Sequence, residues 1–341
     1  MYHWRHEIQS QGPGIDRTPL PDFDSEYEIY PVAYGVCIEC DADEWIQSIL
    51  DIIKQDYIFL QQQNIRFVLF DLHEASKHLY KAAEIFQKAI DRKIYVVTAN
   101  RKLLEQTNPD VQVVFNDYWK TRMPCRPGPL HYMPKKLFIN LTRVARPHRC
   151  MLIDKLIEQG LFDEGYNTIS NLGYEMTNYV NRTPTSKILE QNFHTLDVPD
   201  LINENPNKSV PLQECKKSFV YIATETLVTN ERMFFSEKVY KPIAIGMPFM
   251  TLGNPGTLAV LRKLGYKTFG NWFNEDYDLD IAIEDRISII VENLRILHSK
   301  SDSELVKMRK EMMPLCRKNL KIYRLHNAQW DLDQAIKDIV R

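Results

Sequence analysis

The sequence predicts an α/β protein made of two Rossmann-like domains that face a cleft. Short apolar stretches of strand length alternate with stretches of helical periodicity along most of the 341 residues. Strands that are apolar throughout are typical of a parallel sheet covered by helices on both faces. A segment with four prolines at 122–135 divides the pattern into two series, and such a linker stops helices and central strands. Two α/β domains joined in this way imply a cleft between them, where ligands commonly bind.

The first series predicts an amino-terminal domain over 29–130, after an irregular leader over 1–28. A helical face carries Trp45, Ile49, Ile52 and Ile53, and a second helix is expected over Glu74–Ile90. The apolar runs predict four strands: Tyr30–Cys37, Ile65–Phe70, Ile94–Thr98 and Val111–Phe115.

The second series predicts a carboxyl-terminal domain over 131–325, followed by a helix over 326–341 that can pack back on the amino-terminal domain. Its expected strands are Leu137–Leu141, Phe219–Ala223 and Pro248–Leu252. Its expected helices are Pro147–Gln159, one from about Ser236, Gly256–Leu264, and two long segments at 279–299 and 303–340.

Composition restricts the class of protein. Lys plus Arg number 43 and Asp plus Glu 45, a formal charge of −2. That balance argues against a general binder of nucleic acid or anionic membranes, so any anion recognition must be local. No apolar run has the length of a membrane span, the amino terminus lacks the apolar core of a signal peptide, and the six cysteines resemble reduced thiols. We therefore expect a cytoplasmic globular protein.

The densest basic cluster lies at the junction of a predicted strand and a predicted helix, where free backbone N–H groups already favour anions. Arginine binds phosphate with two parallel hydrogen bonds and keeps its charge. The cluster therefore indicates a phosphate site, with a solvated basic loop as the alternative. Its arginines are Arg143, Arg146 and Arg149.

A second group of charged residues surrounds the strand expected at 219–223. Glu225 follows the strand, and Ser236 can cap a helix whose first turn carries Glu237 and Lys238, with Lys241 one turn on. A carboxylate beside a lysine at a helix start suits a nucleotide, because the acid can accept both ribose hydroxyls while the lysine meets the pyrophosphate. The alternative is an ordinary ion pair on the surface.

The run SFVYIATETLVTNERMFFSEKVYKPIAIGMPFM resembles the donor-binding motif of the α1,3-fucosyltransferases. It is still more similar to glycosyltransferases of large DNA viruses and phages. Those proteins also carry segments like Asn140–Arg149, Gly253–Gly256 and Leu264–Phe269, and the resemblance covers about 136–300.

The resemblance implies a GT-B fold in which the carboxyl-terminal domain holds the donor, in the host cytoplasm if the chain is viral. By position, Glu237 matches the acid that binds ribose, Lys238 the lysine that binds diphosphate, and Arg149 the phosphate arginine. Glu225 matches an acid near the donor sugar. Pro242 departs from the family pattern and is expected to kink the helix.

Inverting transfer needs a base for the acceptor hydroxyl and a group that stabilises the leaving diphosphate. The cations of the donor site can serve the second need, so we expect no metal and no cofactor besides the nucleotide-sugar. The base should come from loops that follow strands of the first domain. The candidates are Glu39, Asp41, Asp71, His73, Glu74 and Asp117.

The sequence thus predicts a glycosyltransferase (a hexosyl- or pentosyltransferase) that moves a sugar from a UDP- or GDP-sugar to a hydroxyl of a glycan acceptor. A nucleotide- or glycan-binding module without catalysis and a glycoside hydrolase with paired carboxylates are the alternatives. Neither nucleic acid nor a membrane span is expected. We interpret the acidic stretch Asp276–Asp280 as a solvated loop. The Cys37–Cys40 spacing and the pair His73 and His78 resemble metal-binding motifs, but we interpret neither as a metal site.

Overall fold

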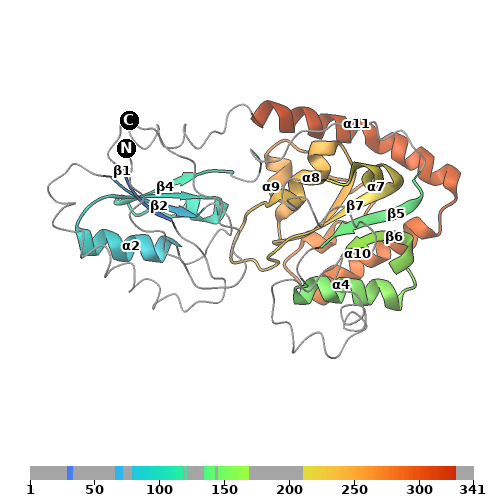
Figure 1. Cartoon of the computed structure of the whole chain (residues 1–341), viewed down its shortest axis with the longest axis horizontal. Helices are drawn as coiled ribbons and strands as arrows, with labels where there is room; N and C mark the ends of the chain where they lie inside the picture. Colours follow the sequence, from blue (N-terminus) through green and yellow to red (C-terminus); the bar gives the residue numbers. More distant parts are fainter. Residues whose placement is uncertain are drawn as a thin grey trace. The chain divides into compact units, whose positions relative to one another are not determined.

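The computed structural model describes residues 29–33, 66–71, 79–117, 120, 134–142, 145–168 and 210–327. The chain divides into two compact units. Unit 1 comprises Met1–Tyr118, Glu231–Phe234 and Trp330–Arg341, and unit 2 comprises Trp119–Asn230 and Phe235–Gln329. Each unit contains a four-stranded parallel sheet (Figure 1). The predicted α/β class with parallel sheets is confirmed.

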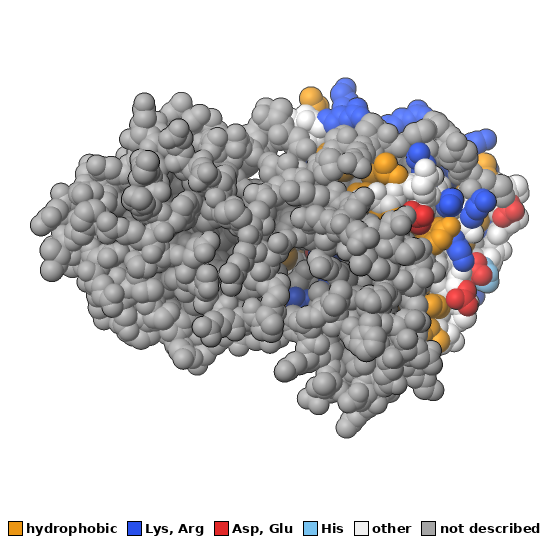
Figure 2. Space-filling model, in the orientation of Figure 1, with side chains coloured by type: hydrophobic (Ala, Val, Ile, Leu, Met, Phe, Trp, Pro, Cys, Tyr) orange, Lys and Arg blue, Asp and Glu red, His pale blue; other side chains and the backbone are white. Residues whose placement is uncertain are grey.

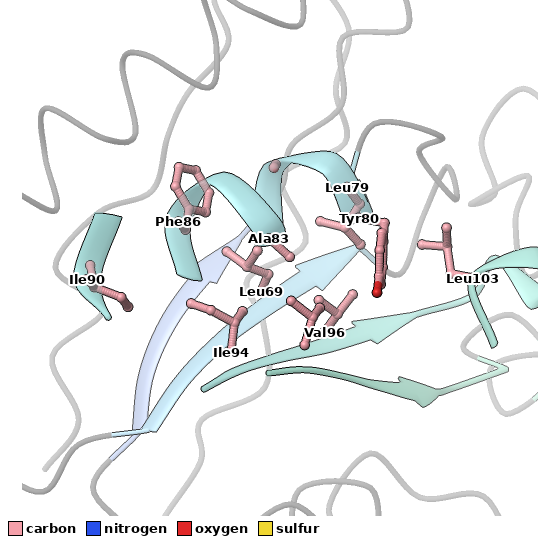
Figure 3. Packing of buried hydrophobic residues seen from close by; sticks show 11 residues of the cluster. Leu69, Leu79, Tyr80, Ala83, Phe86, Ile90, Ile94, Val96 and Leu103 are labelled. Atoms are coloured by element: carbon pink, nitrogen blue, oxygen red, sulfur yellow. The ribbon is translucent and has the colours of Figure 1, made fainter. Parts of the chain in front are cut away.

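In unit 1 the strands follow one another across the sheet in chain order: β1 (Ile29–Ala33), β2 (Arg66–Asp71), β3 (Ile94–Thr98) and β4 (Val111–Phe115). Helix α2 (Leu79–Ile90) connects β2 to β3, and the short η1 (Arg101–Glu105) follows β3. Phe86 of α2 belongs to a buried hydrophobic cluster with Leu69, Ile94 and Val96 of the sheet, and this cluster forms the core of the unit (Figure 3). The described strands of this sheet contain no reversal of order.

In unit 2 the strand order does reverse. The sheet runs β6 (Gly165–Thr168), β5 (Lys136–Leu141), β7 (Ser218–Thr224) and β8 (Phe249–Leu252). From β5 the chain moves to one neighbour, β6, and β7 then lies on the other side of β5. All seven residues of β7 are buried, as expected for a central parallel strand. The reversal between β5 and β7 is the arrangement at whose carboxyl edge α/β proteins bind ligands.

The helices of unit 2 cover both faces of this sheet (Figure 1). Because parallel crossovers are right-handed, α4 (Pro147–Glu158), between β5 and β6, and α8 (Glu237–Ile245), between β7 and β8, lie on opposite faces. The helix α10 (Ile283–His298) packs on α4, and α11 (Asp302–Asn327) packs on α8. The remaining short elements are α7 (Leu212–Lys217), α9 (Thr257–Lys263), η2 (Phe162–Glu164) and η4 (Asp276–Asp278).

The predicted elements that fall on described residues are found at or near the expected bounds. Sequence patterns missed β6, whose residues Gly-Tyr-Asn-Thr offer no apolar run, and the single-turn helix α7. The helix expected over 279–299 begins later, at Ile283, because η4 and a turn precede it. The leader over 1–28, the helix at 45–53 and the segment 328–341 lie outside the described residues.

The two helices that start at the reversal have well-defined ends. Pro147 occupies the first position of α4. An N–H at this position has no partner within the helix, so proline costs no hydrogen bond there. Ser236 caps α8 by accepting the Lys238 N–H, and Gly246 ends it with a left-handed backbone at φ 69°. Pro242 lies inside α8, and the helix continues beyond it to Ile245.

Gly165 of β6 lies against the ring of Phe138 in β5. A Cβ atom at position 165 would come within 2.2 Å of that ring, so only glycine lets the two strands pair as they do. We expect Gly165→Ala to lower the free energy of unfolding by about 1–3 kcal/mol through overpacking. The same change in a Phe138→Leu background should cost less, because leucine lacks the ring atoms that clash. Urea denaturation of the four proteins measures this coupling, and equal costs in both backgrounds would contradict it.

Candidate functional site

The charged residues that the sequence placed in one donor site gather at the carboxyl edge of β5 and β7. Glu225 directly follows β7, as predicted, and Ser236, the N-cap residue of α8, lies eleven residues after it. The start of α4 is tied to the same edge, because His148 Nε2 donates to the Glu225 carbonyl oxygen at 2.9 Å. Two helix starts therefore meet at the strand reversal. We call the residues 140–142, 145–149, 224–226 and 236–241 the β5/β7 edge.

The side chain of Glu225 joins the end of β7 to the start of α8. Its Oε1 accepts the Ser236 N–H at 3.0 Å, and its Oε2 accepts the Ser236 hydroxyl at 2.6 Å and the Thr226 N–H at 3.3 Å. The carboxyl is 1% exposed, and burial raises its pKa despite the nearby Lys238 charge. Both oxygens are thus engaged by protein donors, which makes Glu225 a positioning residue for α8.

Glu237 and Lys238 form an ion pair at the first turn of α8, with Nζ 2.6 Å from Oε1. Burial works against the charged form of Glu237, but the positive charges of Lys238 and Lys241 outweigh it and lower the pKa of the carboxyl. Burial lowers the pKa of Lys241 to about 8. Lys238 is the more accessible of the two lysines, with 18% of its side chain exposed, and its Nζ also lies 3.4 Å from Ser236 Oγ.

The first turn of α4 brings a second set of basic side chains to this edge. Arg149 is buried, and its Nη2 donates to the Thr224 carbonyl oxygen at 3.1 Å. His148 is buried as well, and burial together with the Arg149 charge lowers its pKa to about 3. A neutral ring that carries its proton on Nε2 is the form that can donate to the Glu225 carbonyl. Arg146 is the N-cap residue of α4 and is half-buried.

A buried polar cluster that the sequence patterns did not reveal lies under the same edge. Asn140 Oδ1 accepts from the Thr224 hydroxyl at 3.2 Å, and the Thr142 and Thr224 hydroxyls are 3.2 Å apart. The Thr142 N–H donates to Thr168 Oγ1 at 2.9 Å. Within the described part of the chain, Asn140 Nδ2 has no hydrogen-bond partner. The cluster joins the ends of β5, β6 and β7, and only the position of these residues at strand ends could have pointed to them.

Arg286 of α10 fixes the loops beside the edge. Its guanidinium donates to three carbonyl oxygens: Tyr277 at 2.6 Å, Val228 at 3.1 Å and Gly253 at 2.7 Å. These carbonyls belong to η4, to the loop after β7 and to the loop after β8. The side chain is 1% exposed. Sequence reasoning missed it because two of its three partners lie 33 and 58 residues away along the chain.

The acidic stretch at 276–280 is only in part the solvated loop that was expected. Asp276 and Asp280 are exposed. Asp278 is buried, however, and its Oδ2 accepts the Leu258 N–H at 2.9 Å, so it caps α9. Burial raises the pKa of Asp278 to about 6. The expectation was therefore wrong for Asp278, because a periodicity search does not see a carboxylate that turns inward to a helix start.

The expected catalytic bases are not described at the level of side chains, with one exception. Asp71 is the last residue of β2, and its side chain lies outside the description. Asp117 is buried and pairs with Arg101 at 2.8 Å. The remaining candidates and one donor-site arginine lie outside the described residues: Glu39, Asp41, His73, Glu74 and Arg143. The same holds for Cys37, Cys40 and His78.

Two features are absent from the described part of the chain: a group of metal-binding side chains and a membrane-spanning helix. Within the described ranges, no group of three or more His, Cys, Asp and Glu side chains is placed to hold a metal ion. None of the helices in those ranges combines the length and the apolar character of a membrane span. The three described cysteines, Cys150, Cys215 and Cys316, carry buried free thiols.

The buried His148 should make stability depend on pH. Its pKa of about 3 in the folded chain lies below its ordinary 6.5, so between those values the unfolded chain binds a proton that the folded chain does not. Stability is therefore lost as pH falls from about 6.5 toward 3. Between about pH 7 and pH 5 we expect the wild type to lose on the order of 2 kcal/mol more than His148→Gln, which keeps a neutral N–H donor. Urea denaturation at both pH values measures the difference, and parallel losses would show that His148 is not buried in its neutral form.

No protein-family model matches the chain, and a search of the curated proteins finds no match. The function must therefore be argued from the chemistry of the β5/β7 edge.

Proposed function

We propose that this protein is a glycosyltransferase of the GT-B type, which binds a nucleoside-diphosphate sugar at the β5/β7 edge and transfers the sugar to a hydroxyl of a glycan acceptor. One observation carries the proposal. The start of α8, with Glu237 and Lys238 in its first turn, meets the start of α4 at the reversal of a parallel sheet. Ligands of α/β proteins bind at this point of the fold, and helix starts favour anions.

The diphosphate of the donor would lie against the first turn of α8. Lys238 offers a partly exposed ammonium there, and the positive end of the helix dipole adds to its charge. In the free protein Nζ is held between Glu237 Oε1 and Ser236 Oγ. It is thus already in place near the helix start, so binding a phosphate oxygen needs little loss of side-chain freedom.

The ribose would be recognised by Glu237. Its lowered pKa keeps the carboxylate charged, and a charged carboxylate accepts hydrogen bonds from two neighbouring hydroxyls. Lys241 supports this charge from the next turn of α8, at a pKa of about 8 that leaves it mostly protonated at neutral pH. The pair of lysines therefore offsets the burial of the acid that reads the sugar of the nucleotide.

In the proposed site Glu225 positions α8, and Arg149 contributes positive charge. Glu225 uses both carboxylate oxygens to fix Ser236 and Thr226, so it sets where α8 begins. Arg149 donates to the end of β7 and adds positive charge at the edge toward which the leaving diphosphate would point. Buried cations act strongly there because little water screens them.

In the proposed reaction, a base removes the proton of the acceptor hydroxyl while its oxygen attacks the anomeric carbon from the face opposite the diphosphate. The bond between that carbon and the diphosphate oxygen breaks, and the nucleoside diphosphate leaves with the electron pair. The configuration is inverted. Lys238 and the helix starts stabilise the charge that develops on the leaving oxygen. The base is expected among Glu39, Asp41, Asp71, His73 and Glu74.

Binding of free nucleoside diphosphates tests the donor site. We expect UDP or GDP to bind the full chain, and Lys238→Ala to weaken that binding by roughly tenfold to a hundredfold, the worth of one hydrogen bond to a charged group. Glu237→Ala should weaken binding of the nucleotide but not of inorganic diphosphate, which has no ribose. Isothermal titration calorimetry measures each Kd. Lys155→Ala, which removes a cation from the far end of α4, is the matched control.

Three outcomes separate the proposal from its alternatives. Absence of nucleotide binding, or equal affinity in Lys238→Ala and Lys155→Ala, would rule out a donor site at this edge. Tight nucleotide binding with neither sugar transfer nor slow donor hydrolysis would identify a binding module that lacks catalysis. Cleavage of glycosides without any nucleotide would identify a hydrolase.

A further inference from the structure

The near-neutral charge of the chain hides a strongly basic helix. Between Leu305 and Leu325, α11 contains seven Lys and Arg residues and a single acid, Glu311. Arg309 is buried, and the other six cations are exposed. They form what we call the α11 stripe: Lys307, Lys310, Arg317, Lys318, Lys321 and Arg324.

The α11 stripe occupies one side of the helix. At 3.6 residues per turn its six members fall within an arc of about 120°, and from Lys307 to Arg324 they extend over about 26 Å. The opposite side of α11 is buried against unit 2 through Met308, Met312 and Tyr323. Figure 2 shows Lys and Arg side chains gathered along the edge of the molecule at which Figure 1 draws α11.

Five of the six cations of the stripe have no carboxylate within ion-pair distance in the described part of the chain. None of Lys307, Lys310, Arg317, Lys318 and Lys321 lies within 4.0 Å of a carboxylate in that part. Glu311 lies at the border of the stripe, where its Oε2 accepts from Trp272 Nε1 at 3.4 Å. By contrast, Arg295 on the exposed face of α10 pairs with Glu292 at 2.7 Å. A row of like charges along a helix is unfavourable for the isolated protein, so it calls for an anionic partner.

We propose that the α11 stripe is a docking surface for a membrane that contains anionic lipids. A straight row of exposed cations on an amphipathic helix can lie parallel to a flat array of headgroups. Four of the six cations are lysines, which act as point charges and need no particular acceptor geometry. Leu325, at the end of the stripe, is 60% exposed, and such a side chain gains by entering the lipid interface.

These features favour lipid over nucleic acid. Proteins that hold single strands combine basic residues with exposed aromatic rings on which bases stack. Within the described part of α11, the aromatic ring of Tyr323 is fully buried, so it is not available for stacking on a base. An exposed leucine can form neither a hydrogen bond nor an ion pair with a phosphate backbone. Lys267 adds a further exposed cation beside the helix, because its N–H donates to Asn319 Oδ1 of α11 at 2.6 Å.

Vesicle co-sedimentation of the full chain tests the proposal. We expect binding to phosphatidylcholine vesicles that contain phosphatidylserine, weaker binding to pure phosphatidylcholine, and loss of binding as salt is raised. The test variant replaces three lysines of the stripe: Lys310→Gln, Lys318→Gln and Lys321→Gln. Because each cation near an anionic surface contributes about a fivefold factor, its partition should fall by on the order of a hundredfold.

The matched control removes the same net charge from α2, α4 and α10: Lys88→Gln, Lys155→Gln and Arg295→Gln. All six positions lie on the protein surface or near it, and equal Tm values will show that both variants fold. Binding retained by the control and lost by the test variant supports the stripe. Equal losses, or no binding to anionic vesicles, overturn the proposal. Binding to double-stranded DNA that exceeds vesicle binding overturns it in favour of a nucleic-acid surface. UDP and GDP should not compete, so this result is independent of the donor site.

Discussion

The arrangement of the site depends on one buried interaction, the grip of the Glu225 carboxylate on the N–H and the hydroxyl of Ser236. This interaction joins the residue that follows β7 to the N-cap residue of α8. It therefore determines the positions of Glu237 and Lys238 in the first turn of the helix. Hydrogen bonds to a charged acceptor are stronger than those between neutral groups. A buried carboxylate without donors would be costly, so the loop after β7 cannot drift while these bonds hold. The proposed donor site would thus be built on the end of β7, although Glu225 itself lies on the connection that follows this strand.

Burial alone does not decide the charge of a group at this edge. Glu225 and Glu237 are both buried carboxylates, yet the pKa of Glu225 is raised and that of Glu237 is lowered. Burial favours the neutral form of both carboxyls. At Glu225 the positive charge of Lys238 does not outweigh burial, and the like charge of Glu237 adds to it, whereas at Glu237 the charges of Lys238 and Lys241 together outweigh burial. His148 and Lys241 show the converse, since burial shifts both toward the neutral form. The first turns of α8 hold Glu237 and two lysines, and the Glu225 carboxyl at the end of β7 lies beside them with its pKa shifted in the opposite direction from that of Glu237.

The fold was more predictable from the sequence than the site. Apolar runs located β3 and β4 to the residue, because most residues of both strands are apolar and β-branched. They failed for β6, whose polar residues pair with β5 because Gly165 lets Phe138 approach. Capping rules found Ser236 and the strand-end rule found Glu225. The contacts of His148, Asn140 and Arg286 could not be read from the sequence. His148 bonds to a residue 77 positions away, Asn140 to one 84 positions away, and Arg286 to two that are 33 and 58 positions away, and local patterns carry no record of such contacts.

The two basic regions of the chain differ in the physics of their charges. At the β5/β7 edge, Arg149 and Lys238 are buried or nearly so and are held by carbonyls and carboxylates at defined distances. Such charges act over short range with strong directional preference, as recognition of one ligand requires. On α11 the lysines are exposed, flexible and without carboxylate partners in the described part of the chain. Their attraction is long-range, weak for each residue and screened by salt, which suits an extended anionic surface. The net charge of −2 describes neither region, because the interactions of a charged side chain depend on its local position and burial.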